Sequence, residues 1–123
     1  MAFDHIGFNV ADLARSRAFY AAALAPLGMG VLKEGEGWAA LGRDGQLSLW
    51  IGAYGPAPGP VHIAFAAPSR EAVRAFHAAA LEAGGADNGG PGLRPNYAPD
   101  YYAAFVHDPD GHNVDAVCRQ AGE

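Results

Sequence analysis

The feature that most constrains the fold of this chain is an internal repeat, in which the first part of the sequence returns 57 residues later. Residues 5–28 align without a gap to residues 62–85, and 11 of the 24 aligned positions are identical. Seven of these identities are not alanine, so the alanine-rich composition alone does not explain them. Two copies are too few for a solenoid, which needs at least three repeats. The chain is therefore expected to contain two copies of one module.

The two modules are separated by a change in composition. The stretch 52–60 holds three glycines and three prolines in nine residues, which is typical of a semi-rigid linker. We therefore expect a first module over 1–52, a linker over 53–60 and a second module over 61–123. A length of 123 residues fits one compact domain that contains both modules.

Each module has the pattern of a strand, a helix and three further strands. Alternation and β-prone residues mark strands, whereas apolar spacing, capping residues and terminal glycines mark helices. The first module is expected to have strands at 5–10, 29–33, 37–41 and 47–52 and a helix at 12–26. The second is expected to have strands at 61–66, 101–107 and 113–118, a helix at 69–83 and a loop at 86–99 with room for one weak strand. The predicted fold class is α+β, with two tandem βαβββ modules.

The charge balance and the absence of apolar runs exclude several kinds of partner. Eight Lys and Arg against 13 Asp and Glu give a net charge of −5, which disfavours nucleic acid and anionic membrane surfaces. No apolar run approaches the ~20 residues of a membrane helix, and the first residues do not resemble a signal peptide. Cys118 is the one cysteine, so no intrachain disulfide can form. We expect a cytoplasmic protein that binds a small molecule.

Three residues form a candidate metal site. The repeat places His5 and His62 at equivalent positions on the two first strands, and Asp115 lies in the middle of the last strand. Two imidazoles and one carboxylate are the ligand set of non-haem Fe(II) sites, and the same set suits Zn, Mn, Ni or Co. The alternative is that both histidines are half-buried structural residues kept by shared ancestry, with Asp115 facing solvent.

A second candidate region is the segment 94–102, which is rich in aromatic residues. Arg94, Tyr97, Tyr101 and Tyr102 are candidates for the wall of a small-molecule pocket, and Trp50 of the first module is a further candidate. The alternative is that Tyr101 and Tyr102 are ordinary strand aromatics on opposite faces. No serine lies in a G-x-S-x-G motif, so no catalytic residue is assigned.

Three segments carry a family resemblance that covers most of the chain. They are DHIGFNVADLARSRAFYAAALAPLG, PVHIAFAAPSREAVRAFHAAALEAGG and YYAAFVHDPDGHNVDAVC. With them the chain resembles the vicinal-oxygen-chelate superfamily, which includes glyoxalase I, extradiol dioxygenases, fosfomycin-resistance enzymes and bleomycin-resistance proteins. The resemblance implies that the two βαβββ modules form an open, curved β-barrel around a metal.

The resemblance also implies a ligand set. First-strand ligands match His5 and His62, and the last-strand carboxylate matches Asp115, where the family usually has Glu. The fourth position of the family falls near Ser48 or Leu49, neither of which is a strong ligand. Glyoxalase I enzymes use four protein ligands, so three ligands are more similar to the dioxygenase set. Family members often dimerise, and a homodimer is expected here.

Two functions follow from the resemblance. The first is a divalent-metal-dependent enzyme, of lyase, isomerase or dioxygenase type, that acts on a small molecule with vicinal oxygens while the segment 94–102 closes over it. The alternative is a metal-free binding protein of the bleomycin-resistance type. Its groove would be lined by aromatic side chains, with Trp38, Trp50, Tyr97, Tyr101 and Tyr102 as the candidates.

Overall fold

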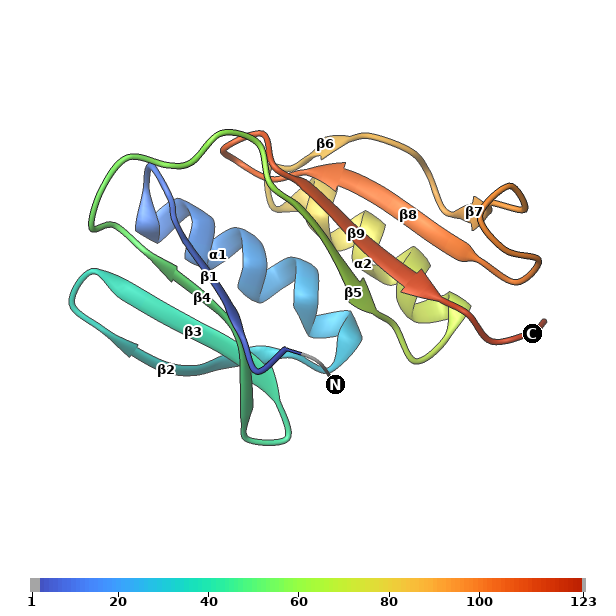
Figure 1. Cartoon of the computed structure of the whole chain (residues 1–123), viewed down its shortest axis with the longest axis horizontal. Coiled ribbons are helices and arrows are strands. Elements are labelled where there is room, and N and C mark those ends of the chain that lie inside the picture. The colour runs from blue at the N-terminus through green and yellow to red at the C-terminus, as the bar shows by residue number, and fades with distance from the viewer. Residues whose placement is uncertain (1–2, 123) are drawn as a thin grey trace.

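The computed structural model describes residues 3–122 and contains two βαβββ modules that lie side by side (Figure 1). The first module consists of β1 (Ile6–Asn9), α1 (Leu13–Leu24), the 3-10 helix η1 (Ala25–Leu27), β2 (Gly30–Gly35), β3 (Trp38–Arg43) and β4 (Gln46–Gly52). The second consists of β5 (His62–Ala66), α2 (Arg70–Glu82), β6 (Ala86–Asp87), β7 (Gly92–Leu93), β8 (Tyr102–His107) and β9 (Asn113–Cys118).

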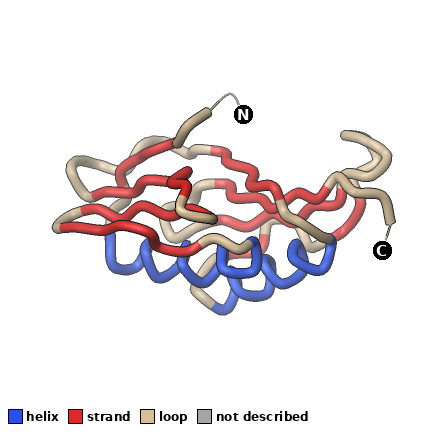
Figure 2. The backbone as a smooth tube through the Cα atoms, turned by 90° about the horizontal axis from the view of Figure 1, so that it is seen from below, coloured by secondary structure: helices blue, strands red, loops and turns tan. Residues whose placement is uncertain are grey.

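Each module forms its own curved sheet. The strand orders are β1-β4-β3-β2 and β5-β9-β8-β6, with β7 also paired to β8. In each module the first and last strands pair in parallel, β1 with β4 and β5 with β9. The strands form one layer and both helices cover the same side of it (Figure 2). The predicted α+β fold of two βαβββ modules is confirmed, and within residues 3–122 the predicted open, curved barrel takes the form of two curved sheets that do not close.

The repeat explains why the two helices start and pack alike. Asp12 and Ser69 are aligned in the repeat, and each caps its helix by accepting a hydrogen bond from the backbone NH three residues on. Phe19 and Phe76 are also aligned, and both are completely buried between the helices and the sheets. The shared residues of the repeat therefore specify the scaffold.

The predicted strands and helices match the observed ones to within two residues at either end, and two details differ. The first helix does not run through to residue 26, because Pro26 favours the short η1 and Gly28 ends it at a positive φ of 81°. The Gly- and Pro-rich segment 86–99 holds two short strands rather than one, and both pair with β8.

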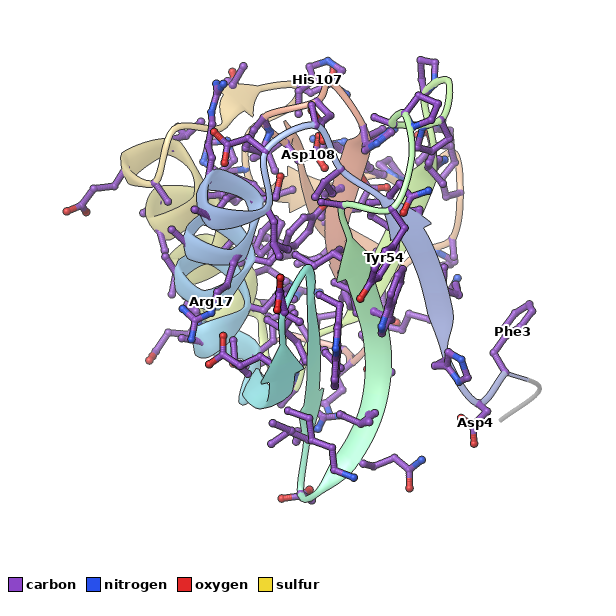
Figure 3. All side chains as sticks on the ribbon, turned by 90° about the vertical axis from the view of Figure 1, so that its left-hand side faces the viewer. Phe3, Asp4, Arg17, Tyr54, His107 and Asp108 are labelled. Atoms are coloured by element: carbon purple, nitrogen blue, oxygen red, sulfur yellow. The ribbon has the colours of Figure 1, made fainter. Side chains whose placement is uncertain are left out.

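The two modules are joined through a buried turn before β9. Asp108 accepts hydrogen bonds from the Tyr20 hydroxyl of α1 and from the backbone NH groups of Asp110 and His112. The backbone NH of Ala11 donates to the Asp110 carboxylate in the same turn. Figure 3 shows Asp108 at the end of the molecule where β1 leads into α1. The turn therefore fixes the second module against the first.

No helix within residues 3–122 is long and apolar enough to cross a membrane. The longest, α2, has 13 residues, whereas a bilayer requires about 20.

Candidate functional site

Side-chain alternation gives each sheet two faces with different roles. Ile63 on β5 and Val114 and Ala116 on β9 point to the core beneath the helices. The residues between them point to the opposite side, because successive side chains of a strand alternate. We call the side turned away from both helices the open face. His62 and Asp115 lie on the open face of the second sheet.

His62 and Asp115 form a directly hydrogen-bonded pair. His62 Nε2 lies 2.6 Å from Asp115 Oδ2, where β5 and β9 run side by side. The His62 side chain is 64% exposed, whereas that of Asp115 is 1% exposed. The second carboxylate oxygen of Asp115, Oδ1, is buried and has no hydrogen-bond partner among residues 3–122. The pair thus combines an accessible imidazole with a desolvated carboxylate.

Burial is the main influence on the ionisation of Asp115. Desolvation raises the pKa of Asp115, and the hydrogen bond and charge of His62 oppose that rise without cancelling it. With the ring proton on Nε2, His62 donates to the carboxylate and leaves Nδ1 as a free acceptor. An imidazole oriented by a buried carboxylate is suited to proton transfer.

Further along the same face, two arginines lie over aromatic rings. The Arg94 guanidinium is 5.0 Å from the centre of the Phe105 ring, and Phe105 is directly opposite Asp115 on the neighbouring strand. The Arg119 guanidinium is 4.8 Å from the centre of the Tyr101 ring. The open face of the second sheet therefore carries a hydrogen-bonded His–Asp pair together with cationic and aromatic groups.

The corresponding position in the first sheet holds a tryptophan. Asp115 pairs with Ala64, two residues after His62, and Trp50 pairs with Gly7, two residues after His5. Trp50 is therefore the structural equivalent of Asp115. Its ring stacks on Tyr54, with centroids 5.9 Å apart and planes inclined by 12°. The fourth family position accordingly falls on Trp50, whereas the sequence placed it at Ser48 or Leu49 through an error in register.

Glycines make room for this indole. A side chain on Gly52 would meet the Trp50 ring at 2.2 Å, and one on Gly7 would meet it at 3.2 Å. The ring therefore lies flat along the open face of the first sheet. Indole is not a metal ligand, because its nitrogen is a donor only. The first module thus lacks the carboxylate that the second has.

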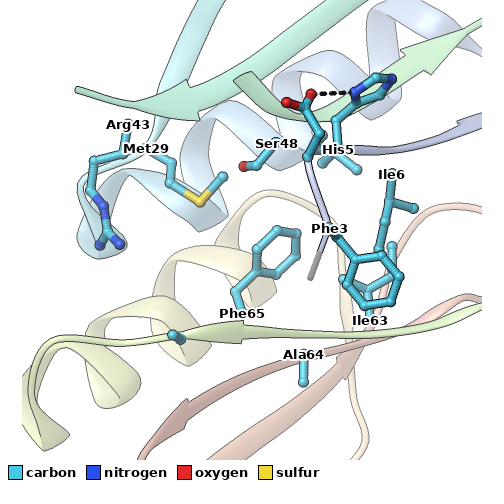
Figure 4. A pocket seen from close by; sticks show the side chains of 12 residues that line it. Phe3, His5, Ile6, Met29, Arg43, Ser48, Ile63, Ala64 and Phe65 are labelled. Carbon is cyan, nitrogen blue, oxygen red and sulfur yellow. Dashed lines mark hydrogen bonds and ion pairs between the residues drawn. The ribbon is translucent and has the colours of Figure 1, made fainter. Parts of the chain in front are cut away.

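His5 lies apart from the His62–Asp115 pair. Its Nδ1 is 2.7 Å from Asp4 Oδ1, and both side chains are exposed. His5 is at the rim of a cavity of about 240 Å³ between the two sheets, which is lined mainly by apolar side chains such as Met29 and Phe65 (Figure 4). The residues near His5 therefore do not include His62 or Asp115, the other two predicted ligands.

Taken as a metal site within one chain, the three predicted ligands do not fit. His62 and Asp115 are together, but residues 3–122 contain no group of three His, Cys, Asp or Glu side chains arranged to hold a metal ion. His5 belongs to the other module, and Trp50 occupies the fourth position. One chain thus supplies two donors for a divalent ion, which is fewer than a catalytic site needs.

The other predicted pocket residues lie in three places. Arg94 and Tyr101 are on the open face of the second sheet, and Tyr97 packs edge-on against Tyr101. Tyr102 lies on the helix side, where its hydroxyl accepts a hydrogen bond from Arg74 of α2. Trp50 lies on the first sheet, away from this group.

Sequence reasoning missed Phe105 and Arg119. Simple alternation could have found Arg119 but not Phe105. Arg119 is four residues after Asp115, so its side chain leaves the strand on the same face. Phe105 becomes Asp115's neighbour only once the register of β8 and β9 is known, since the turn before β9 sets that register.

Comparisons with known proteins agree with this architecture. The family model described as the Glyoxalase/Bleomycin resistance protein/Dioxygenase superfamily matches residues 2–116. A glyoxalase/bleomycin resistance protein from Albidiferax ferrireducens T118 is 32% identical, with 98% of this chain and 100% of that chain covered and a TM-score of 0.82. No curated protein matches the sequence.

Two more distant structures share the fold. A lactoylglutathione lyase from Agrobacterium tumefaciens is 21% identical, with coverage of 95% and 92% and a TM-score of 0.67. The oxidase ChaP-H2 is 21% identical, with coverage of 100% and 97% and a TM-score of 0.70. On the evidence of its repeat, its paired βαβββ sheets and the match over residues 2–116, the chain belongs to the Glyoxalase/Bleomycin resistance protein/Dioxygenase superfamily.

Proposed function

We propose that the protein is an enzyme that moves a proton on a small molecule with adjacent oxygen atoms, with His62 and Asp115 as its acid–base pair. The observation that carries this proposal is the 2.6 Å contact between an exposed imidazole and a carboxylate that is almost fully buried. A structural histidine on a solvent-facing strand has no need of a desolvated carboxylate, which is expensive to bury.

The chemistry that these groups support is enolisation. Nδ1 of His62 takes a proton from the carbon between a hydroxyl and a carbonyl group, and the electron pair left on carbon moves to the carbonyl oxygen. The resulting imidazolium is stabilised by the Asp115 carboxylate through Nε2. Returning the proton to the former carbonyl carbon, with the hydroxyl proton moving to the enolate oxygen, gives the isomer, and returning it to the original carbon gives exchange.

A second candidate is a divalent-metal enzyme, and the type of donor atoms favours it. An imidazole nitrogen and a carboxylate oxygen are ligands for Zn, Ni, Fe, Mn and Co. Since one chain brings only His62 and Asp115 together, such a site requires His5 of a second copy in a homodimer. When bound, the metal would polarise the two adjacent oxygens of the substrate.

The test is hydrogen–deuterium exchange of hydroxyacetone, dihydroxyacetone and glycolaldehyde in D2O, followed by proton NMR. We expect the protein to accelerate exchange of the carbon-bound hydrogens above the buffer rate. His62→Gln should lower the protein-dependent rate by about 100-fold or more, the size of a general-base contribution. His77→Gln, on α2 and bonded to Asp87 rather than to the open face, is the matched control and should leave the rate unchanged.

Metal content separates the two candidates. If His5→Ala leaves exchange intact, the pair acts within one chain. If His5→Ala abolishes both exchange and about one equivalent of bound divalent metal per site, the metal enzyme is correct. Absence of exchange with all three compounds would contradict both candidates and favour the metal-free binding protein.

A further inference from the structure

We infer that the open face of the second sheet contains an anion subsite, with Arg119 as its cation, and that the protein's ligand is a small monocarboxylate with a short apolar body. This inference rests on the proposed function only in placing the reacting end of that ligand at His62. The subsite itself is argued from a hollow, an unpaired cation and an apolar floor.

The hollow adjoins the His62–Asp115 pair. Its volume is about 440 Å³, and Ala64, Ala66 and Val117 form its floor. Ala64 is the register partner of Asp115, and Ala66 is the partner of Val117, so the floor continues directly from the pair along the two strands. Because residues 64 and 66 are alanines, no large side chain from β5 fills this part of the open face. Such a floor suits hydrocarbon rather than polar groups.

Arg119 lies at the far end of this hollow, together with Tyr101. The Tyr101 ring is 4.8 Å from the guanidinium carbon and holds it by a cation–π contact. No acidic side chain of residues 3–122 forms an ion pair with Arg119. In contrast, Arg17 has a bidentate contact with Glu34. The donors of Arg119 are thus available to a ligand, in a chain whose net charge is −5.

The number of cationic groups in the hollow and the distance between Arg119 and the His62–Asp115 pair indicate which class of anion would bind. A guanidinium matches a carboxylate by two parallel hydrogen bonds. One cation at this end suits a monoanion better than a phosphate dianion. Arg119 is four positions after Asp115, about 13 Å along an extended backbone. Since Tyr101 holds the guanidinium at the far end, the apolar body of the ligand would lie along the Ala64, Ala66 and Val117 floor, between the anion subsite and the His62–Asp115 pair.

The experiment is a titration followed by amide NMR, with hexanoate as the probe and hexanamide as its uncharged counterpart. We expect hexanoate to shift the backbone amides of Ala66 and Val117, and hexanamide to bind at least about tenfold more weakly. Arg119→Gln should weaken hexanoate binding by about tenfold or more, since a charge-assisted contact is lost. Arg15→Gln, on the exposed side of α1, is the control and should not change it.

Several outcomes would overturn the subsite. They are equal binding of hexanoate and hexanamide, equal binding by Arg119→Gln, and stronger binding of inorganic phosphate than of hexanoate. Tyr101→Leu provides a second variant, which should weaken hexanoate severalfold by releasing the guanidinium. His62→Gln should still bind hexanoate, so failure of the exchange assay and failure of the anion subsite are distinguishable.

Discussion

Trp50 and Asp115 occupy the same position in two copies of one module, yet one makes an aromatic stack and the other makes a buried polar contact. Trp50 lies flat over the glycines of its sheet and stacks on Tyr54, which is 65% exposed. Asp115 is buried and bonded to a histidine. In the first sheet the open face is an aromatic surface, and in the second it is a polar site. Equivalent positions of one scaffold therefore carry different chemistry on the open faces of the two sheets.

A second pair of aligned positions shows the same asymmetry on the helices. Tyr20 of α1 is buried and bonds to Asp108 of the second module. Its repeat partner His77 of α2 bonds to the exposed Asp87 within its own module. Tyr20 therefore connects its helix to the other module, whereas the His77 contact with Asp87 stays within one module. The turn that contains Asp108 is a structural anchor, whereas the Asp44–Gly45 turn before β4 is exposed.

The largest effect should come from breaking that anchor. Asp108→Ala removes the acceptor of the buried Tyr20 hydroxyl and of the His112 backbone NH. Leaving two such donors without partners should lower the free energy of unfolding by about 3 kcal/mol. Urea denaturation followed by circular dichroism measures the change.

The control for Asp108→Ala lies two residues away in the same turn. Asp110 accepts one exposed hydrogen bond, from the backbone NH of Ala11. Asp110→Ala should therefore cost less than about 1 kcal/mol. If the two variants lose equal stability, the turn acts as a whole and Asp108 is not its anchor.

The aromatic surface of the first module gives the next prediction. Trp50→Ala removes the stack on Tyr54 and uncovers Gly7 and Gly52. We expect a loss of about 2 kcal/mol, from the stack and from the apolar area that the indole covers. Thermal and urea unfolding measure it. Tyr54→Phe keeps the stack and loses only the exposed hydrogen bond to the Glu36 carbonyl oxygen, so it should cost less than about 1 kcal/mol. A neutral Trp50→Ala would mean that the indole is not part of the folded scaffold.

The internal repeat allowed the fold to be predicted from the sequence. The alternation of side chains along the strands allowed part of the candidate site to be predicted. Local sequence patterns predict the helix caps at Asp12 and Ser69 and the buried rings at Phe19 and Phe76, because each depends only on a residue and its neighbours along the chain. The equivalence of Trp50 and Asp115 is not local, because it depends on which residue of the last strand pairs with the first. A shift of one or two residues in that pairing moved the fourth position to Ser48 or Leu49.

The position of His5 could not be read from the sequence for a different reason. Alignment of His5 with His62 says that the two residues hold the same place in their modules, but not that the modules bring them together. That depends on how the sheets pack, and here each first strand lies at the edge of its own sheet. His5 therefore meets Asp4 at the rim of the cavity between the sheets.

The smallest effect expected is a pH dependence that belongs to Asp115 alone. Burial raises its pKa above the value of about 3.9 that an unfolded chain has, so the folded state binds the proton more tightly. The resulting stability is fully present below pH of about 4 and is lost as pH rises through the raised pKa of the folded state. Asp115→Asn removes this titration while its amide oxygen can still accept from His62. Its stability relative to the wild-type protein should therefore improve between pH 4 and pH 7, as urea midpoints at several pH values will measure.

Asp44→Asn, at an exposed turn in the first module, is the control and should follow the wild-type curve. A parallel curve for Asp115→Asn would show that the His62 contact cancels the effect of burial on the pKa of Asp115, and the two modules would then differ in shape but not in the energetics of their open faces.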